Sequence, residues 1–284
     1  MISLDGARRV GGGDVNDAYE VCGDDGARIF VKTRAGAAPG EYATEAAGLR
    51  WLAEPGALPV PEVVEVREEW LALRWIDTGG AYSDEDLGRG LAAIHTAGAP
   101  SVGALPPGAP GPLRIGPLAF GAPAAASAAG ASAKARGSGA DWPGFYAEVL
   151  LAPLIPRAGL SPAGRAAVQR VCERIEDLAG PAEPPARLHG DLWSGNVMAG
   201  ADGRPWLIDP AAYGGHREID LAMLRLFGSP SPRLLAAYEE VAPAAAGHED
   251  RVALYQLLPL LVHAVLFGGG YADSVERSAK HYAG

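Results

Sequence analysis

The fold is decided by the stretch LHGDLWSGN (188–196) and by the segment WLID (206–209) that follows it. Asp191 and Asn196 are five residues apart, and Asp209 lies thirteen residues beyond Asn196. Isolated Asp and Asn residues usually form solvated turns. A rigid loop that carries Asp and Asn, followed by a strand that ends in a second Asp, instead predicts that the three side chains meet in one cleft.

Such a set of side chains meets the needs of phosphoryl transfer. That reaction uses a carboxylate to orient and deprotonate the acceptor hydroxyl, and oxygen ligands to hold Mg²⁺ on the nucleotide phosphates. The spacing from His189 through Asp191 to Asn196 reproduces the His-x-Asp-x-x-x-x-Asn pattern of protein kinases. We therefore expect an ATP-dependent kinase whose catalytic residues lie between His189 and Asp209.

Two charged residues in the first third of the chain support the same reading. Lys32 ends the apolar strand 28–32, on the same face as Phe30, and Glu45 shares a helix face with Tyr42 and Leu49. Taken singly, each could be a long side chain that reaches the solvent at the rim of the core. Together, two opposite charges on packed faces are explained by an ion pair, which in kinases positions the lysine on the nucleotide phosphates.

A run of glycines precedes this lysine by about twenty residues. Backbone amides in Gly11-Gly12-Gly13 could approach phosphates without a side-chain clash, although three glycines also suit a flexible turn. The chain has no GxxxxGK[ST] motif, so a P-loop NTPase is disfavoured.

Hydrophobic periodicity predicts an α+β, bilobal architecture. Residues 1–76 are expected to form a nucleotide-binding N-lobe, a small antiparallel sheet with one helix. Residues 77–284 are expected to form a larger, mainly helical C-lobe with the catalytic loop and the acceptor site. The predicted strands are 18–21, 28–32, 63–66 and 70–76, and the predicted helices are 41–53, 84–95, 141–152, 161–179, 218–227, 231–241 and 248–267. Residues 98–140 are rich in Gly, Ala, Pro and Ser and predict a surface loop.

Composition narrows the partners and the compartment. The formal net charge is -10 and the sequence pI is about 5.1, which disfavours nucleic acid and anionic lipid as partners. The only cysteines, Cys22 and Cys172, have no metal-ligand spacing, so a reducing cytoplasm is expected. The most apolar run, 253–267, is short for a bilayer span and predicts a core helix of a soluble protein. We expect a monomer.

Several motifs together resemble one family. The chain is similar to the fructosamine (ketosamine) kinases, which belong to the aminoglycoside phosphotransferase and choline kinase superfamily and have a protein-kinase-like fold. The likeness covers nearly the whole chain. It is carried by GGGDVN (11–16), IFVKT (29–33), HGDLWSGN (189–196), DPA (209–211), YGGHREIDLAM (213–223), LYQLL (254–258) and FGGGY (267–271).

The resemblance implies roles for the residues singled out above. Asp191 would be the catalytic base, and Asn196 and Asp209 would be Mg²⁺ ligands. Lys32 would contact the phosphates of ATP, with Glu45 as its partner. The implied reaction is phosphorylation of a sugar hydroxyl on a ketosamine, either a free glycated amine or a glycated protein.

Other residues of the same motifs have more than one possible role or a structural one. Trp193 could stack on a sugar in the acceptor pocket or be a core tryptophan. Arg217 and Glu218 could reach the acceptor. His189 is expected to hold the catalytic loop by hydrogen bonds, and Asp220 to brace that loop or cap a helix.

The acceptor stays open at this point. Residues 118–140 lie where the resemblance implies a more polar loop, and here that region is mostly Ala and Gly. An aminoglycoside, a choline-like alcohol or another small metabolite could replace the ketosamine. A protein that binds nucleotide without turnover is the alternative from another class.

Overall fold

The computed structural model describes residues 6–11, 16–23, 26–121 and 141–283. Gly12, Gly13 and the segment 122–140 lie outside the described residues, so what the sequence predicts for them stays a prediction.

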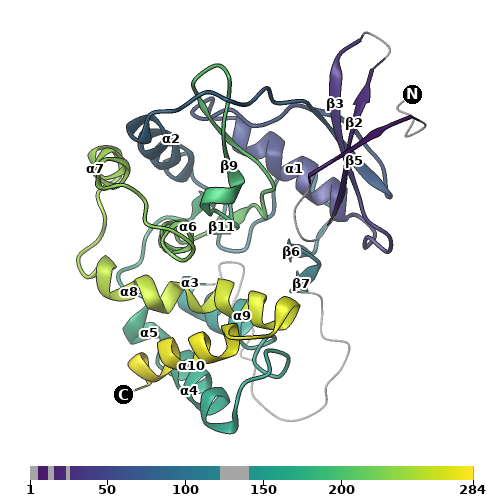
Figure 1. Ribbon diagram of the computed structural model, residues 1–284. Helices are drawn as coiled ribbons and strands as arrows, with labels where there is room; N and C mark the ends of the chain where they lie inside the picture. Colours follow the sequence, from purple (N-terminus) through teal and green to yellow (C-terminus); the bar gives the residue numbers. More distant parts are fainter. Residues whose placement is uncertain (1–5, 12–15, 24–25, 122–140, 284) are drawn as a thin grey trace.

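The N-terminal part is an antiparallel sheet with a helix packed against it (Figure 1). The sheet order is β1-β2-β3-β5-β4, and β3 is its central strand, with Lys32 opposite Ala18 on one side and Leu71 on the other. The elements are β1 (Arg8–Val10), β2 (Asp17–Cys22), β3 (Arg28–Thr33), α1 (Glu41–Ala53), β4 (Val63–Val66) and β5 (Trp70–Arg74).

Alternation along β3 explains how the sheet is covered. Ile29 and Val31 are buried in a small cluster on one face, which leaves Lys32 to the other face, toward α1. Helix α1 then contributes to two cores. Its Leu49 packs against the sheet, whereas its Trp51 packs with residues of the C-terminal part. Because α1 touches both, it joins the sheet to the rest of the molecule.

The C-terminal part is mainly helical. Serine side chains cap three of its helices, as Ser83 does for α2 by accepting from the Asp86 amide. The helices are α2 (Asp84–Thr96), α3 (Trp142–Gly144) with the π-helix Phe145–Leu151, α4 (Pro162–Glu173), α5 (Ile175–Leu178), α6 (Glu218–Leu224), α7 (Pro232–Val241), α8 (His248–Tyr255), α9 (Leu257–Phe267) and α10 (Tyr271–Tyr282).

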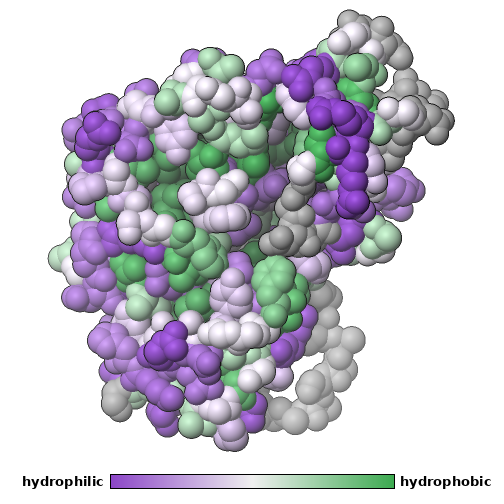
Figure 2. All heavy atoms as spheres, viewed as in Figure 1, coloured by the Kyte–Doolittle hydropathy of each residue, from purple (hydrophilic) through white to green (hydrophobic). Residues whose placement is uncertain are grey.

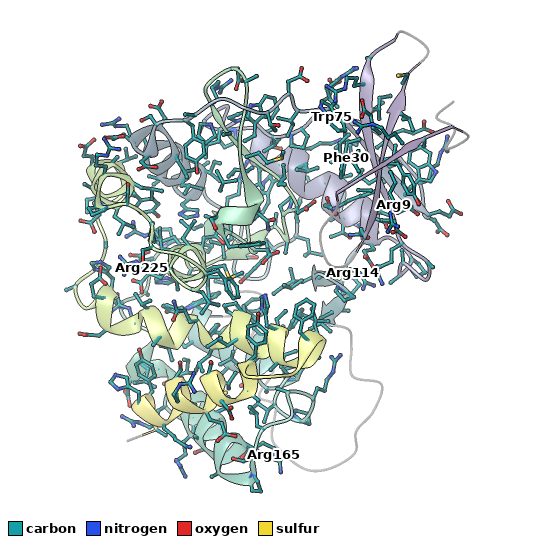
Figure 3. The ribbon with its side chains drawn as sticks, in the orientation of Figure 1. Arg9, Phe30, Trp75, Arg114, Arg165 and Arg225 are labelled. Carbon is teal, nitrogen blue, oxygen red and sulfur yellow. The ribbon has the colours of Figure 1, made fainter. Side chains whose placement is uncertain are left out.

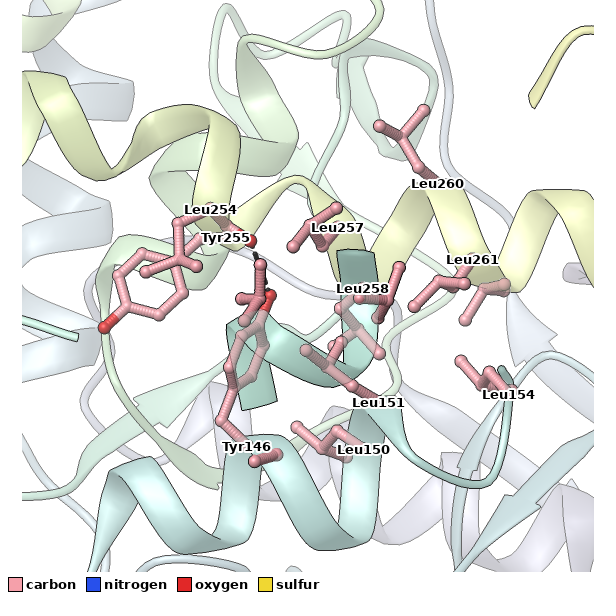
Figure 4. Packing of buried hydrophobic residues seen from close by; sticks show 14 of the residues in the cluster. Tyr146, Leu150, Leu151, Leu154, Leu254, Tyr255, Leu257, Leu258, Leu260 and Leu261 are labelled. Atoms are coloured by element: carbon pink, nitrogen blue, oxygen red, sulfur yellow. Dashed lines mark hydrogen bonds between the residues drawn. The ribbon is translucent and has the colours of Figure 1, made fainter. Parts of the chain in front are cut away.

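The main core lies among these helices. Figure 4 shows leucines of α9 packed on leucines of the π-helix, and the hydroxyl of buried Tyr146 donates to the Leu254 carbonyl at 2.8 Å. The run His248–Phe267 is apolar and long enough to cross a membrane by length and composition, but core helices pass that test as well. Here Leu257 and Leu261 are buried in the core, which agrees with the predicted core helix.

Short strand pairs carry the central loops. In one pair, β8 leads into the loop that carries Asp191 and Asn196, and β11 follows Asp209. The second pair, β9 with β10, lies between Asn196 and Asp209. A third pair, β6 with β7, packs beside α1. Their bounds are β6 (Leu113–Ile115), β7 (Leu118–Phe120), β8 (Ala186–Leu188), β9 (Val197–Ala199), β10 (Pro205–Leu207) and β11 (Tyr213–Gly215), with a 3₁₀ turn at Ser194–Asn196.

The structure confirms the α+β arrangement and differs from the predicted elements in detail. The segment predicted as a loop over 98–140 contains the β6–β7 hairpin, whose three-residue strands are too short for a periodic signal. Helix α10 is absent from the predicted elements. Val275 and Ala279 are its only buried residues, so few apolar positions mark it in the sequence. The predicted helix 248–267 is interrupted at Gln256.

Helices α2 and α7 pack closely because Gly88 has no side chain. A Cβ added there would lie 2.2 Å from the Leu234 carbonyl oxygen. We predict that Gly88→Ala lowers the free energy of unfolding by about 1–3 kcal/mol, although alanine is the better helix former. Urea unfolding followed by circular dichroism measures this. The control Gly270→Ala has open space around its Cβ and should be neutral or stabilising; equal effects of the two substitutions would contradict the packing argument.

Candidate active site

A cleft of about 440 Å³ separates the sheet and α1 from the C-terminal helices. Figure 2 shows hydrophobic side chains gathered around the hollow between the two parts, with hydrophilic side chains over much of the outer surface. The cleft is lined by five of the candidate residues from the sequence: Lys32, Glu45, Asp191, Asn196 and Asp209. They come from four separate segments of the chain.

Lys32 lies between two carboxylates. Its Nζ is 2.5 Å from Glu45 Oε1 and 2.8 Å from Asp209 Oδ1. Burial acts to lower the pKa of Lys32, but the two carboxylates outweigh it and hold the pKa above its ordinary value. Burial likewise acts to raise the pKa of Asp209, and the Lys32 ammonium holds it below its ordinary value. The ion pair expected from the sequence is therefore present, and it extends to Asp209.

Asp209 has an unusual backbone conformation. Its φ is 52°, in the left-handed region that side chains other than glycine rarely adopt. Such strain persists where the surroundings overdetermine it, and it concentrates at functional sites. Here the bond to Lys32 holds the carboxylate toward the sheet, at the start of the turn that leads to β11.

Asp191 and Asn196 meet at the other wall of the cleft. The amide Nδ2 of Asn196 donates to the backbone carbonyl of Asp191 at 2.7 Å and to its Oδ2 at 3.2 Å. Burial, with Asp209 and Asp220 nearby, raises the pKa of Asp191 to about 6. The carboxylate is thus held in place by its neighbour and is still ionised at neutral pH.

The oxygen atoms at this site suit Mg²⁺. Asn196 uses its amide nitrogen on Asp191, which leaves its Oδ1 as a hard oxygen donor, and the carboxylate of Asp209 lines the same cleft. The described residues contain no group of three or more His, Cys, Asp or Glu side chains that could enclose a metal. That donor set fits an ion that shares its coordination with phosphate oxygens and water, as Mg²⁺ does on nucleotides.

A buried network of hydrogen bonds holds the loop of Asp191 and Asn196 on the side away from the cleft. Asp220, fully buried, accepts from the backbone amides of His189 at 2.7 Å and Gly190 at 2.9 Å, and from His95 Nε2 at 3.1 Å. His189 donates from Nε2 to the Ile208 carbonyl at 2.9 Å and accepts the Asp191 amide at Nδ1. Asp220 therefore braces the loop, and His189 joins it to the strand that leads to Asp209.

Aromatic side chains form the wall opposite the sheet. Trp193 is 37% exposed, lines the cleft and packs edge-on against Phe227 at 5.9 Å between ring centroids, so it is not a core tryptophan. Phe227 in turn contacts His263, which packs against Phe267 and Tyr271. His263 belongs to no motif in the sequence, and the nearest sequence signal is the FGGGY segment (267–271), whose Phe267 and Tyr271 pack against it.

Three further candidates are placed outside the cleft wall. Gly11, which follows β1, is exposed and does not line the cleft, while Gly12 and Gly13 are not among the described residues. Arg217 is held by Glu183 at 2.7 and 2.8 Å. Glu218 is buried against Arg251 at 2.6 and 2.9 Å. Arg217 and Glu218 thus have side-chain partners of their own and are not among the residues that line the cleft.

Comparison with known proteins agrees with this geometry. The family model described as fructosamine kinase matches residues 1–283. The chain belongs to the fructosamine kinase family. A Thermus thermophilus protein assigned as a ketoamine kinase is 36% identical over 94% of this chain and 90% of its own length. The chloroplastic protein-ribulosamine 3-kinase of Arabidopsis thaliana is 33% identical over 93% of this chain and 78% of its own length.

Solved structures place the fold in the same group. A Thermobifida fusca protein assigned as a fructosamine-3-kinase has a TM-score of 0.83 and 39% sequence identity, and the match covers 96% of this chain and 92% of that one. A choline kinase of Streptococcus pneumoniae has a TM-score of 0.61 at 16% identity, over 98% of this chain and 92% of that one. This more distant match shows the kinase-like fold alone. As a member of the fructosamine kinase family, the protein is an ATP-dependent kinase.

The hydrogen bonds of Asp220 to the loop of Asp191 can be tested by substitution. Asp220→Asn keeps the side-chain shape but removes the charge that three donors share. We predict a fall in kcat of about tenfold to a hundredfold, with a loss of about 2–4 kcal/mol in unfolding free energy. Steady-state kinetics and urea unfolding measure the two effects. Asp202→Asn, at an exposed carboxylate bonded to Trp206, is the control and should change neither quantity.

Proposed function

We propose that the protein transfers the γ-phosphoryl group of ATP to a sugar hydroxyl of a ketosamine. The observation that carries the proposal is the convergence, in one cleft, of the buried Lys32–Glu45–Asp209 group and the Asp191–Asn196 pair. The names of the Arabidopsis and Thermobifida relatives specify position 3 of the sugar, and we extend that position to this chain.

The residues of the cleft divide into two sets. Lys32, held by Glu45, binds and orients the nucleotide phosphates, while Ala18 and Phe30 of the sheet line the end of the cleft where a nucleotide base would lie. Asn196 and Asp209 would hold Mg²⁺, which supplies charge neutralisation for the phosphates when bound.

Asp191 acts on the acceptor hydroxyl. Its carboxylate orients the hydroxyl toward the γ-phosphorus and takes its proton as the bond to phosphorus forms. Asn196 holds the carboxylate in position by donating to it, and the brace through Asp220 keeps the loop from shifting. An ionised carboxylate at neutral pH suits both tasks, because the pKa of Asp191, raised by burial to about 6, still lies below 7.

The acceptor lies on the aromatic wall. An aromatic face such as that of Trp193 stacks on the apolar face of a sugar, and its exposed fraction leaves room for this. We propose free ketosamines and glycated proteins as the acceptors. We propose further that the enzyme works in the cytoplasm, because its cysteines are few and unpaired, and that it is a monomer.

Asp191 and an acceptor panel test the reaction together. We predict that the wild-type enzyme phosphorylates a fructosyl-amine and a ribulosyl-amine at position 3 and leaves an aminoglycoside panel unmodified. Asp191→Asn should lower kcat by about a hundredfold to ten-thousandfold with an unchanged melting temperature. A coupled ADP assay and phosphorus NMR of the product measure these effects. Full turnover by the folded Asp191→Asn protein would refute the assignment of Asp191.

Lys32 tests the nucleotide side. Lys32→Met removes the ammonium that Glu45 and Asp209 share, so we predict that kcat/KM for ATP falls about a hundredfold to a thousandfold. The matched control is Lys280→Met, at an exposed lysine of α10. Kinetics at saturating acceptor measure both variants. An unchanged kcat/KM for ATP in Lys32→Met would contradict the proposed phosphate contact.

A further inference from the structure

One cation in the cleft has no role in the reaction described so far. Two of the described residues that line the cleft are Lys or Arg, namely Lys32 and Arg114. Lys32 forms ion pairs with Glu45 and Asp209. Arg114, in β6, has no ion pair or hydrogen bond with any described residue, and its Nε is buried without a partner. A desolvated donor that the chain leaves unmatched is a feature of ligand sites.

Two glutamates of α1 that line the same cleft are paired with other cations and not with Arg114. Glu41, which also lines the cleft, is held by both of its oxygens to Arg34, at 2.5 and 2.7 Å. Glu45 is held by Lys32. The guanidinium of Arg114 is therefore available to an anion that enters from outside.

A second unmatched donor lies on the same wall. Thr44 of α1 is 9% exposed, lines the cleft and has no hydrogen-bond partner for its Oγ1 among the described residues. The strand of Arg114 packs beside α1, and the approach of Pro110 to Gly40, 2.8 Å from an added Cβ, puts the preceding segment against the start of that helix. A hydroxyl and a guanidinium on one wall form a polar site suited to a carboxylate.

The fold places this site on the acceptor side. Leu113 and Ile115, on either side of Arg114, are buried in the main core, so the strand is fixed in position. Ile115 also lines a small cavity with Asp191 and His263. Figure 3 shows Arg114 between the N-terminal sheet and helix α9, where the cleft opens toward the C-terminal helices. The nucleotide-base end, at Ala18 and Phe30, belongs to the sheet.

We propose that Arg114 binds a carboxylate on the acceptor, with the Thr44 hydroxyl as a second donor, and that the enzyme prefers ketosamines formed from free amino acids. A guanidinium binds a planar carboxylate through two parallel hydrogen bonds. A lysine glycated within a protein has no free carboxylate, because that group is in the peptide bond. The proposal rests on the proposed function and names the substrate class of the same site.

The test compares two acceptors that differ in charge and hardly in size. The probes are N-fructosyl-glycine, with a carboxylate, and N-fructosyl-glycinamide, with an amide in its place. We expect the wild-type enzyme to favour the carboxylate about ten- to a hundredfold in kcat/KM. Arg114→Gln should abolish this preference by raising KM for fructosyl-glycine about ten- to a hundredfold, with kcat and the KM for ATP unchanged. The matched control is Arg233→Gln, at an exposed arginine of α7.

The remaining outcomes separate the two proposals. Turnover of both acceptors without preference by the wild-type enzyme would overturn the role of Arg114 and leave the proposed function standing. An equal loss of kcat with both acceptors in Arg114→Gln would assign Arg114 to the transferred phosphoryl group instead. Turnover of neither acceptor by the wild-type enzyme would refute the proposed function, and this inference with it.

Discussion

The structure depends on the buried ammonium of Lys32, which two carboxylates from different segments hold at the same time. Lys32 is 5% exposed, and burying an unpaired charge is prohibitively costly, so the sheet can close over it only when Glu45 and Asp209 are in place. Closure of the sheet over Lys32 and assembly of the Lys32–Glu45–Asp209 group therefore depend on each other. The strained backbone of Asp209 is tolerated for the same reason, because its carboxylate has this fixed partner.

Helix α1 links the Lys32–Glu45–Asp209 group to the loop that carries Asp191. At its middle, a Cβ on Gly48 would lie 3.2 Å from the Cβ of Ala212, so the helix lies close to the turn after Asp209. At its end, the buried Arg187 of β8 donates to the Trp51 carbonyl and pairs with Glu54 at 2.9 Å. Since β8 leads directly to His189, one helix positions both the partner of Lys32 and the strand before Asp191.

The two sides of the cleft are built by different means. On the side of the sheet, the charges of Lys32, Glu45 and Asp209 are matched to one another within the chain. Elsewhere the cleft has aromatic faces around Trp193 and His263, and polar atoms of Arg114 and Thr44 that have no partner among the described residues. Under the proposed function, the matched charges would bind the nucleotide common to all kinases, and the unmatched donors would select the acceptor that supplies the missing partner.

The sequence by itself determined the fold class and the family, and the spacing of Asp191, Asn196 and Asp209 predicted the shared cleft that these three side chains line. It also indicated the pair of Lys32 and Glu45, since each charge breaks the apolar pattern of its own element. Only the tertiary structure decided that Arg217 and Glu218 pack against other side chains, and that His263 and Arg114 line the cleft. Those outcomes depend on contacts between segments that are distant in the sequence. The hydrophobic periodicity and the residue spacing of one segment do not reveal which other segment it will contact.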